Sequence, residues 1–160
     1  MTQTDTPHAA GPTPAAPAAG QVDPRGPQFG AALTVVLLAV VLATAPSALA
    51  TVVLAVQIVL FALGATLGVA RTPYAWLFSA LVRPRLGAPR EWEDPQPPRF
   101  AQAVGLAFAV VGLLGLLGGA TTVALVAVGF ALAAALLNAA FGFCLGCEMY
   151  LLGTRLTRRA

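Results

Sequence analysis

The chain has 160 residues, of which 58% are hydrophobic and only 9% are charged. A soluble domain has about a quarter charged residues, so this composition predicts an integral membrane protein. The net charge of +3 comes from nine basic and six acidic residues, and in a membrane protein such an excess directs topology rather than nucleic-acid binding. The single histidine, His8, lies in a segment rich in proline and alanine, so no histidine-based metal, cofactor or catalytic site is expected.

The N-terminal residues 1–22 are mostly threonine, proline, alanine and glycine. Such a segment buries little apolar surface, and we expect a disordered tail. Asp23 and Pro24 follow in the order of a helix N-cap and a proline at the first helical position. A transmembrane domain is predicted over residues 23–152, and a short basic tail over residues 153–160.

Four apolar runs predict four transmembrane helices, over residues 29–45, 48–70, 100–117 and 121–152. A helix needs about 20 apolar residues to span a bilayer, with a range of about 17–25. The fourth run, taken as one helix, is longer than this, so it must tilt or protrude. The expected fold is all-α: two helical hairpins in one bundle, with short turns at Pro46-Ser47 and at residues 118–122.

The arginines lie on one side of this topology. They precede the first span, occupy the loop of residues 71–99, or follow the last span, and neither short turn carries a charge. Positive residues near span ends stay in the cytoplasm, so we predict a multi-pass protein of the plasma membrane with both termini and the central loop cytoplasmic. One alternative stays open for the first span, because Ala48-Leu49-Ala50 has the form of a signal-peptidase site.

The central loop divides into two parts. Thr72 and Pro73 can begin a short helix that Pro84 would end, and its apolar residues suit either an interfacial helix or a lid on the bundle. The charged residues of the loop form a candidate docking surface for a soluble partner: Arg83, Arg85, Glu91, Glu93 and Asp94. A solvated loop with weak surface ion pairs is the alternative interpretation.

Both cysteines, and the only acid within an apolar run, lie late in the fourth run as Cys144, Cys147 and Glu148. In one continuous helix the three share a face, and the two thiols come near bonding range across one turn. The pair would then lie deep in a helix near its negative end, which disfavours a thiolate. Three arginines are candidates to offset this effect: Arg83, Arg85 and Arg155.

Three interpretations of the cysteine pair stay open. The first is a redox or sulfur-carrying pair, with Glu148 as a proton acceptor or as a brake on reactivity. The second is packing alone, because cysteine behaves as a small hydrophobe and Gly142 and Gly146 let another helix approach closely. The third is a metal site, in which a homodimer or a partner would complete the ligand set that Cys144 and Cys147 begin.

Three strings of residues carry a resemblance to a known family. They are Asp23-Pro-Arg25 with Phe29; Arg83-Pro-Arg-Leu-Gly87 with Glu93-Asp94 and Pro97-Pro-Arg-Phe-Ala-Gln102; and Leu137-Asn-Ala-Ala-Phe-Gly-Phe-Cys-Leu-Gly-Cys-Glu148 with Tyr150. With these the chain resembles the uncharacterised bacterial membrane family called domain of unknown function 4395, over about residues 22–152. The resemblance implies a small integral membrane protein with no established activity. It also favours thiol or sulfur chemistry with a soluble thioredoxin-like or sulfurtransferase-type partner, since members are encoded near such proteins.

Overall fold

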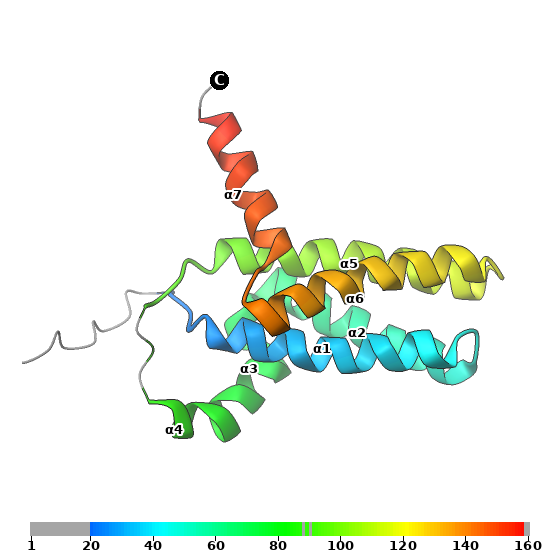
Figure 1. Cartoon of the computed structure of the whole chain (residues 1–160), viewed down its shortest axis with the longest axis horizontal. Helices are drawn as coiled ribbons and strands as arrows, with labels where there is room; N and C mark the ends of the chain where they lie inside the picture. The colour runs from blue at the N-terminus through cyan, green and yellow to red at the C-terminus, as the bar shows by residue number, and fades with distance from the viewer. Residues whose placement is uncertain (1–19, 88, 90, 159–160) are drawn as a thin grey trace, which may run out of the picture.

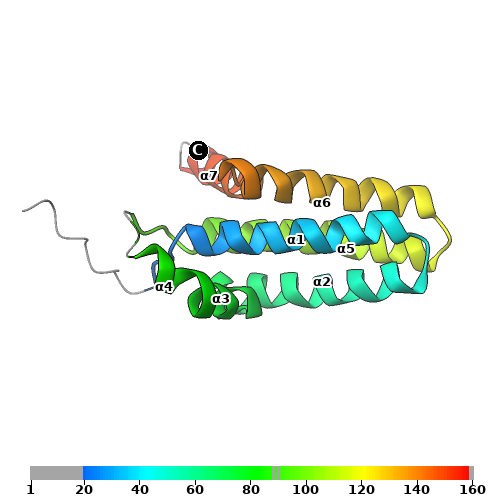
Figure 2. The same ribbon diagram turned by 60° about the horizontal axis from the view of Figure 1, so that its bottom comes forward.

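The structure is a computed structural model that describes residues 20–87, 89 and 91–158. Four long helices lie side by side in an antiparallel bundle (Figure 1, Figure 2): α1 (Arg25–Thr44), α2 (Ala48–Leu67), α5 (Gln96–Leu117) and α6 (Thr121–Phe141). The two tight turns lie at one end of the bundle, and the central segment and the start of α1 lie at the other. This arrangement confirms the predicted all-α bundle of two hairpins.

Shorter helical segments follow each hairpin. After α2 the chain forms a 3₁₀ turn, a short helix, a π-helical turn and another short helix: η1 (Val69–Arg71), α3 (Pro73–Leu77), η2 (Phe78–Val82) and α4 (Arg83–Leu86). After α6 a final helix, α7 (Leu145–Thr157), runs crosswise away from the bundle (Figure 1).

The core lies between the four long helices, where Leu38, Leu54 and Val128 are fully buried. Glycines of α5 let the neighbouring helices approach closely, as is usual between membrane helices. A Cβ atom placed at Gly105 would lie 2.8 Å from the ring of Phe61. The long helices therefore pack through small residues on their inner faces.

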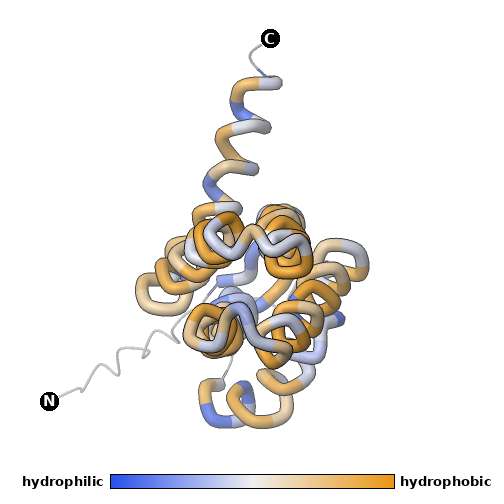
Figure 3. The backbone as a smooth tube through the Cα atoms, turned by 90° about the vertical axis from the view of Figure 1, so that its right-hand side faces the viewer, coloured by the Kyte–Doolittle hydropathy of each residue, from blue (hydrophilic) through white to orange (hydrophobic). Residues whose placement is uncertain are grey.

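The long helices consist mostly of hydrophobic residues, as Figure 3 shows in a view along the bundle, and many of these residues are exposed on its outer surface. Val52, Leu114 and Phe130 are each about three-fifths exposed, at 60%, 63% and 62%. All four long helices are long and apolar enough to cross a membrane. So large an exposed apolar surface is not tolerated in water, and the four helices indicate a multi-pass membrane protein whose outer faces contact lipid.

The fourth apolar run is two helices, so the prediction of one span over residues 121–152 is wrong. Gly142 has φ 67° and ψ 9°, a left-handed conformation that glycine adopts without strain, and its N–H donates to the carbonyl oxygen of Asn138 at 2.9 Å. The 21 residues of α6 suffice to cross a bilayer. The chain can therefore turn at this glycine, and α7 begins at Leu145. The other three predicted spans match α1, α2 and α5 to within four residues.

The boundaries of the predicted tails also change. Residues 1–19 lie outside the described part of the chain, but Val22 is 6% exposed and exchanges two backbone hydrogen bonds with Glu93, each 3.0 Å long. The ordered domain therefore includes Val22. At the other end α7 continues to Thr157, through most of the predicted basic tail, and residues 159–160 lie outside the described part.

Two helix ends differ from expectation. Asp23 is not the N-cap of α1, which begins at Arg25; its carboxylate accepts the Arg25 N–H at 3.0 Å instead. Pro84 does not end the helical segment, which continues to Leu86. The reason is that Pro84 falls in the first turn of α4, where a missing N–H costs nothing, after the wide π-helical turn.

The start of the central segment agrees with the sequence. Pro73 is the first residue of α3, and the Thr72 hydroxyl accepts the N–H of Ala75 at 3.2 Å. Phe78 is 5% exposed and its ring lies 5.9 Å from that of Phe29 on α1, whereas Trp76 is 71% exposed. One face of the segment thus packs on the bundle and the other points outward.

Candidate functional site

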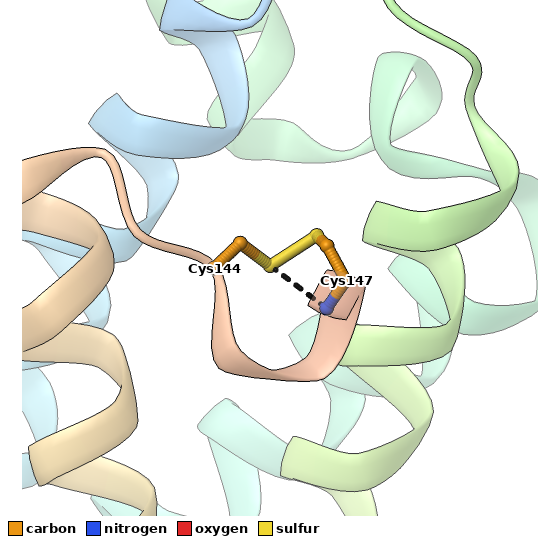
Figure 4. The surroundings of a disulfide bond; sticks show 2 residues. All are labelled: Cys144 and Cys147. Atoms are coloured by element: carbon orange, nitrogen blue, oxygen red, sulfur yellow. Dashed lines mark hydrogen bonds between the residues drawn. A yellow bond between two sulfur atoms is a disulfide. The ribbon is translucent and has the colours of Figure 1, made fainter. Parts of the chain in front are cut away.

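Cys144 and Cys147 form a disulfide at the start of α7 (Figure 4), with their Cα atoms 5.2 Å apart. Cys144 is the N-cap residue of this helix, and its backbone is extended. Its sulfur accepts the backbone N–H of Cys147 at 3.3 Å. The expectation that the pair lies deep in a helix near its negative end is wrong, because the break at Gly142 places the pair at the N-terminus of a new helix.

This position reverses the electrostatics expected from the sequence. The free N–H groups at a helix N-terminus carry a partial positive charge. Thiolates at such positions are stabilised, as in other Cys-x-x-Cys motifs that begin a helix. The N-terminus of α7 therefore supplies the positive environment for which the sequence suggested an arginine.

Glu148 lies in the first turn of α7, one turn after Cys144. It is exposed, and its backbone N–H donates to the Cys144 carbonyl oxygen at 3.1 Å. A carboxylate in the first turn stabilises a helix through the positive end of the helix dipole. The structure thus brings Glu148 into the same turn as the two cysteines, with its side chain exposed.

Contacts with α5 hold this first turn of α7 in place. A Cβ atom at Gly146 would lie 2.7 Å from both the Cα and the Cβ atom of Ala101. The rings of Phe100 and Tyr150 lie 5.8 Å apart. Gly146 therefore permits close helix approach, as predicted, whereas Gly142 serves the turn.

The candidate arginines do not lie beside the cysteines. Arg83 and Arg85 belong to α4, which lies on the opposite side of the bundle end from α7 (Figure 1, Figure 2). Arg85 donates to the carbonyl oxygen of Leu81 in its own segment. Arg155 lies on α7 itself, three turns after Cys144. The charge near the disulfide therefore comes from the helix terminus.

The acidic members of the predicted docking surface have contacts within the chain. The Asp94 carboxylate accepts the N–H of Gln96 at 2.8 Å, at the start of α5. The backbone of Glu93 pairs with Val22. Partial burial and the carboxylates of Glu91 and Asp23 raise the pKa of Glu93. Part of this charged loop therefore organises the end of the bundle.

The sequence did not single out the ion pair between Asp23 and Arg25, which spans 2.9 Å. Arg25 also donates to the carbonyl oxygens of Leu86 and Gly87, at 3.3 and 3.0 Å. Partial burial by itself raises the pKa of Asp23, but hydrogen bonds from Arg25 and the charges of Arg25 and Arg83 outweigh it, so the pKa lies below its ordinary value. The close spacing of Asp23 and Arg25 was the available signal.

Two further features bear on ligands. Arg83 lines a cavity of about 380 Å³ at this end of the bundle, together with Arg71, Trp76 and Trp92. Within the described residues, no three His, Cys, Asp or Glu side chains gather in a group that could hold a metal ion.

One comparison with known proteins gives a match. A sequence model of the family described as Domain of unknown function (DUF4395) matches residues 22–155. The matched stretch begins at the buried Val22, includes both hairpins, and ends within α7. No curated protein and no solved structure matches the chain.

Proposed function

We propose that this chain, which belongs to the DUF4395 family, is a membrane component of thiol–disulfide exchange, with Cys144 and Cys147 as the exchanging pair. The observation that carries the proposal is the cap position of Cys144, whose sulfur accepts the Cys147 N–H. Serine, threonine, aspartate and asparagine cap helices better than other residues. A thiol here, bonded to a second thiol one turn later, therefore points to chemistry more than to helix stability.

The reaction follows from the order of the two sulfurs. In the reduced protein the Cys144 thiolate attacks one sulfur of a partner disulfide, forming a mixed disulfide and releasing the first partner thiolate. The Cys147 thiolate then attacks the Cys144 sulfur, which breaks the mixed disulfide and releases the second partner thiolate. Two electrons pass from the chain to the partner, and the two protons lost by the cysteines are taken up by the partner thiolates.

Glu148 has a place in this scheme as a proton acceptor. Its carboxylate lies in the first turn of α7 and is exposed, so a proton taken from an attacking thiol can pass on to water. Proton transfer from a thiol to a carboxylate needs the two groups within hydrogen-bond reach or joined by one water. Glu148 is four residues after Cys144, so a change of its side-chain rotamer can bring the carboxylate within this reach of the Cys144 thiol.

The proposed partner is a soluble thioredoxin-like protein that meets the chain at the cytoplasmic side of the plasma membrane. The support is the charge pattern: the start of α1, the central segment, the start of α5 and α7 lie at one end of the bundle (Figure 1), and the arginines within the described residues belong to these parts. Positively charged ends stay in the cytoplasm. Because α4 lies across the bundle end from the disulfide, partner contact at the cysteines is assigned to the exposed Glu148 in the first turn of α7.

Trapping of the mixed disulfide tests the proposal. A Cys147→Ser variant keeps the attacking thiol and loses the resolving thiol, so it should accumulate a covalent adduct with oxidised thioredoxin. The matched Cys144→Ser variant should form much less adduct. Both experiments use the full chain in lipid nanodiscs, with non-reducing electrophoresis and mass spectrometry as the readout.

The same samples identify other outcomes. Alkylation of the wild-type chain should modify both thiols after reduction and neither after mild oxidation. If both thiols stay alkylatable through oxidation and neither variant traps thioredoxin, the cysteines are packing residues and the proposal fails. A mass gain of one sulfur after treatment with a sulfane-sulfur donor, without any thioredoxin adduct, would replace exchange by sulfur carriage.

A further inference from the structure

The last helix has an orientation different from every membrane-spanning helix. α7 begins where α6 ends and runs crosswise to the four long helices (Figure 1), and it extends beyond the cross-section of the bundle (Figure 3). If the long helices stand across a bilayer, a crosswise helix at their end is parallel to the membrane surface. This is the placement of interfacial amphipathic helices.

One face of α7 is a continuous apolar stripe, formed by Leu145, Met149, Leu152 and Leu156. The steps of four, three and four residues keep these side chains on one face of a helix with about 3.6 residues per turn. Their exposed fractions are 43%, 51%, 59% and 61%. The bundle therefore leaves the stripe uncovered along its whole length.

The other two faces of α7 have different surroundings. Gly146 and Tyr150 face α5, where they meet Ala101 and Phe100. Cys147 lies about 140–180° around the helix from the stripe, counting about 100° per residue. The disulfide and the apolar stripe are thus on opposite sides, and the face toward α5 lies between them.

The apolar stripe continues the outer surface of α6. Phe141, the last residue of α6, is 77% exposed, and Phe143 in the connection is 46% exposed. At its other end α7 carries Arg155 and Arg158 near the C-terminus. An apolar face joined to a lipid-facing helix, with Arg155 at its edge and Arg158 at the end of the helix, matches a membrane surface that contains anionic lipids.

We infer that α7 is an interfacial helix whose stripe of Leu145, Met149, Leu152 and Leu156 inserts among lipid acyl chains, while Arg155 and Arg158 contact anionic headgroups. The occupant of the stripe is the bilayer that surrounds the four spans. The disulfide then lies at the level of the headgroups and faces the aqueous phase. The inference concerns lipid contact alone, so it stands or falls separately from the proposed exchange reaction.

Site-directed spin labelling of the full chain tests this placement. Labels are introduced as Leu152→Cys, Leu156→Cys, Arg155→Cys or Arg158→Cys in a Cys144→Ser, Cys147→Ser background, in nanodiscs of zwitterionic and anionic phospholipid. Labels at 152 and 156 should collide more with oxygen, which dissolves in the bilayer, than with a water-soluble nickel chelate. Labels at 155 and 158 should show the reverse preference. The adjacent pair 155 and 156 is the matched comparison.

Two results would overturn the inference. Preference for the nickel chelate at all four sites would place α7 in water. Inaccessibility of 152 and 156 to both reagents would mean that protein, such as a second copy of the chain, covers the stripe. Hydrogen exchange on the unmutated chain adds a measurement that needs no label: the amides of α7 should be better protected in nanodiscs with anionic lipid than without it, and equal protection would contradict the headgroup contact.

Discussion

The two hairpins end in the same way and then diverge. Each second helix is followed by a glycine with positive φ, 92° at Gly68 and 67° at Gly142. A new helix begins soon after each glycine, capped by Thr72 in the first hairpin and by Cys144 in the second. Both cap side chains accept the N–H three residues later, at 3.2 and 3.3 Å.

The helices that follow face different surroundings. The first packs inward, where the Tyr74 hydroxyl donates to Gln57 at 3.0 Å and Phe78 is buried. The second, α7, packs on α5 by one face and leaves its apolar stripe open. A hydroxyl caps the inward helix, and a thiol bonded to a second thiol caps the outward one. The same arrangement of glycine and cap residue is thus followed by an ordinary hydroxyl cap in one hairpin and by a disulfide-bonded cysteine pair in the other.

The largest expected effect concerns how α7 is attached. Gly146→Ala places a methyl group 2.7 Å from backbone and side-chain atoms of Ala101, and overpacking of this kind costs about 1–3 kcal/mol. Gly153→Ala is the matched control, because nothing lies within 4 Å of its added Cβ, and it should gain about 0.5–1 kcal/mol from helix propensity. Thermal unfolding in detergent measures both. Equal shifts for the two variants would mean that α7 does not pack closely on α5.

The second prediction compares the two caps. Thr72→Ala should lower stability by about 1 kcal/mol, because it removes the cap of α3. Cys144→Ser, measured under reducing conditions so that no disulfide contributes, should change stability by less than about 0.5 kcal/mol, because a hydroxyl replaces one weak acceptor with a better one. Unfolding midpoints of both variants give the comparison. A large loss for Cys144→Ser would assign the thiol a packing role.

Much of the bundle could be predicted from the sequence, because span length and turn residues are governed by simple requirements. The break at Gly142 could not. Gly64, Gly105 and Gly112 lie inside long helices as packing residues, so a glycine in an apolar run does not by itself mark a helix end. Only the structure shows that α6 ends at Phe141, after 21 residues that already suffice to cross a bilayer.

The candidate site depended on that break. Its residue types and spacing could be predicted from the sequence, and Cys144, Cys147 and Glu148 do share one turn. Their electrostatic environment could not be predicted, because it reverses when the helix begins at the cysteine pair instead of passing through it. The Pro84 error has a similar origin: proline in a first turn and proline at a helix end look alike in sequence.

The third prediction concerns the inward packing of α3. Tyr74→Phe removes the hydrogen bond to the fully buried Gln57, and should cost about 0.5–1.5 kcal/mol. Tyr150→Phe is the control on α7, because it keeps the ring contact with Phe100 and should change stability by less than about 0.5 kcal/mol. Chemical unfolding in mixed micelles can rank the two. A reversed ranking would show that the outward helix, not the inward one, depends on its tyrosine hydroxyl.

The smallest expected effect is a dependence on pH, and it belongs to the first hairpin. Arg25 joins the Asp23 carboxylate to the carbonyl oxygens of Leu86 and Gly87, so it ties the start of α1 to the end of α4. The pKa of Asp23 lies below its ordinary 3.8, and that of Glu93 lies above its ordinary 4.5. These two shifts act on stability in opposite directions.

The sign of each effect follows from linkage between protonation and folding. Asp23, with a lowered pKa, contributes stability that is present above its unfolded value and is lost as the pH falls through its folded value. Glu93, with a raised pKa, favours folding below its unfolded pKa, and this contribution disappears as the pH rises through its folded pKa.

Asp23→Asn should therefore lower the melting temperature at pH 7. It should also reduce the fall in melting temperature that the wild-type chain shows below pH 3.8. Glu93→Gln should instead raise the melting temperature slightly at neutral pH. Glu93 is exposed, and Arg25, the ion-pair partner of Asp23, is partly exposed, so solvent screening keeps these changes small. If the melting temperature of Asp23→Asn falls below pH 3.8 as steeply as that of the wild type, the charge of Asp23 does not contribute to the contact between α1 and α4.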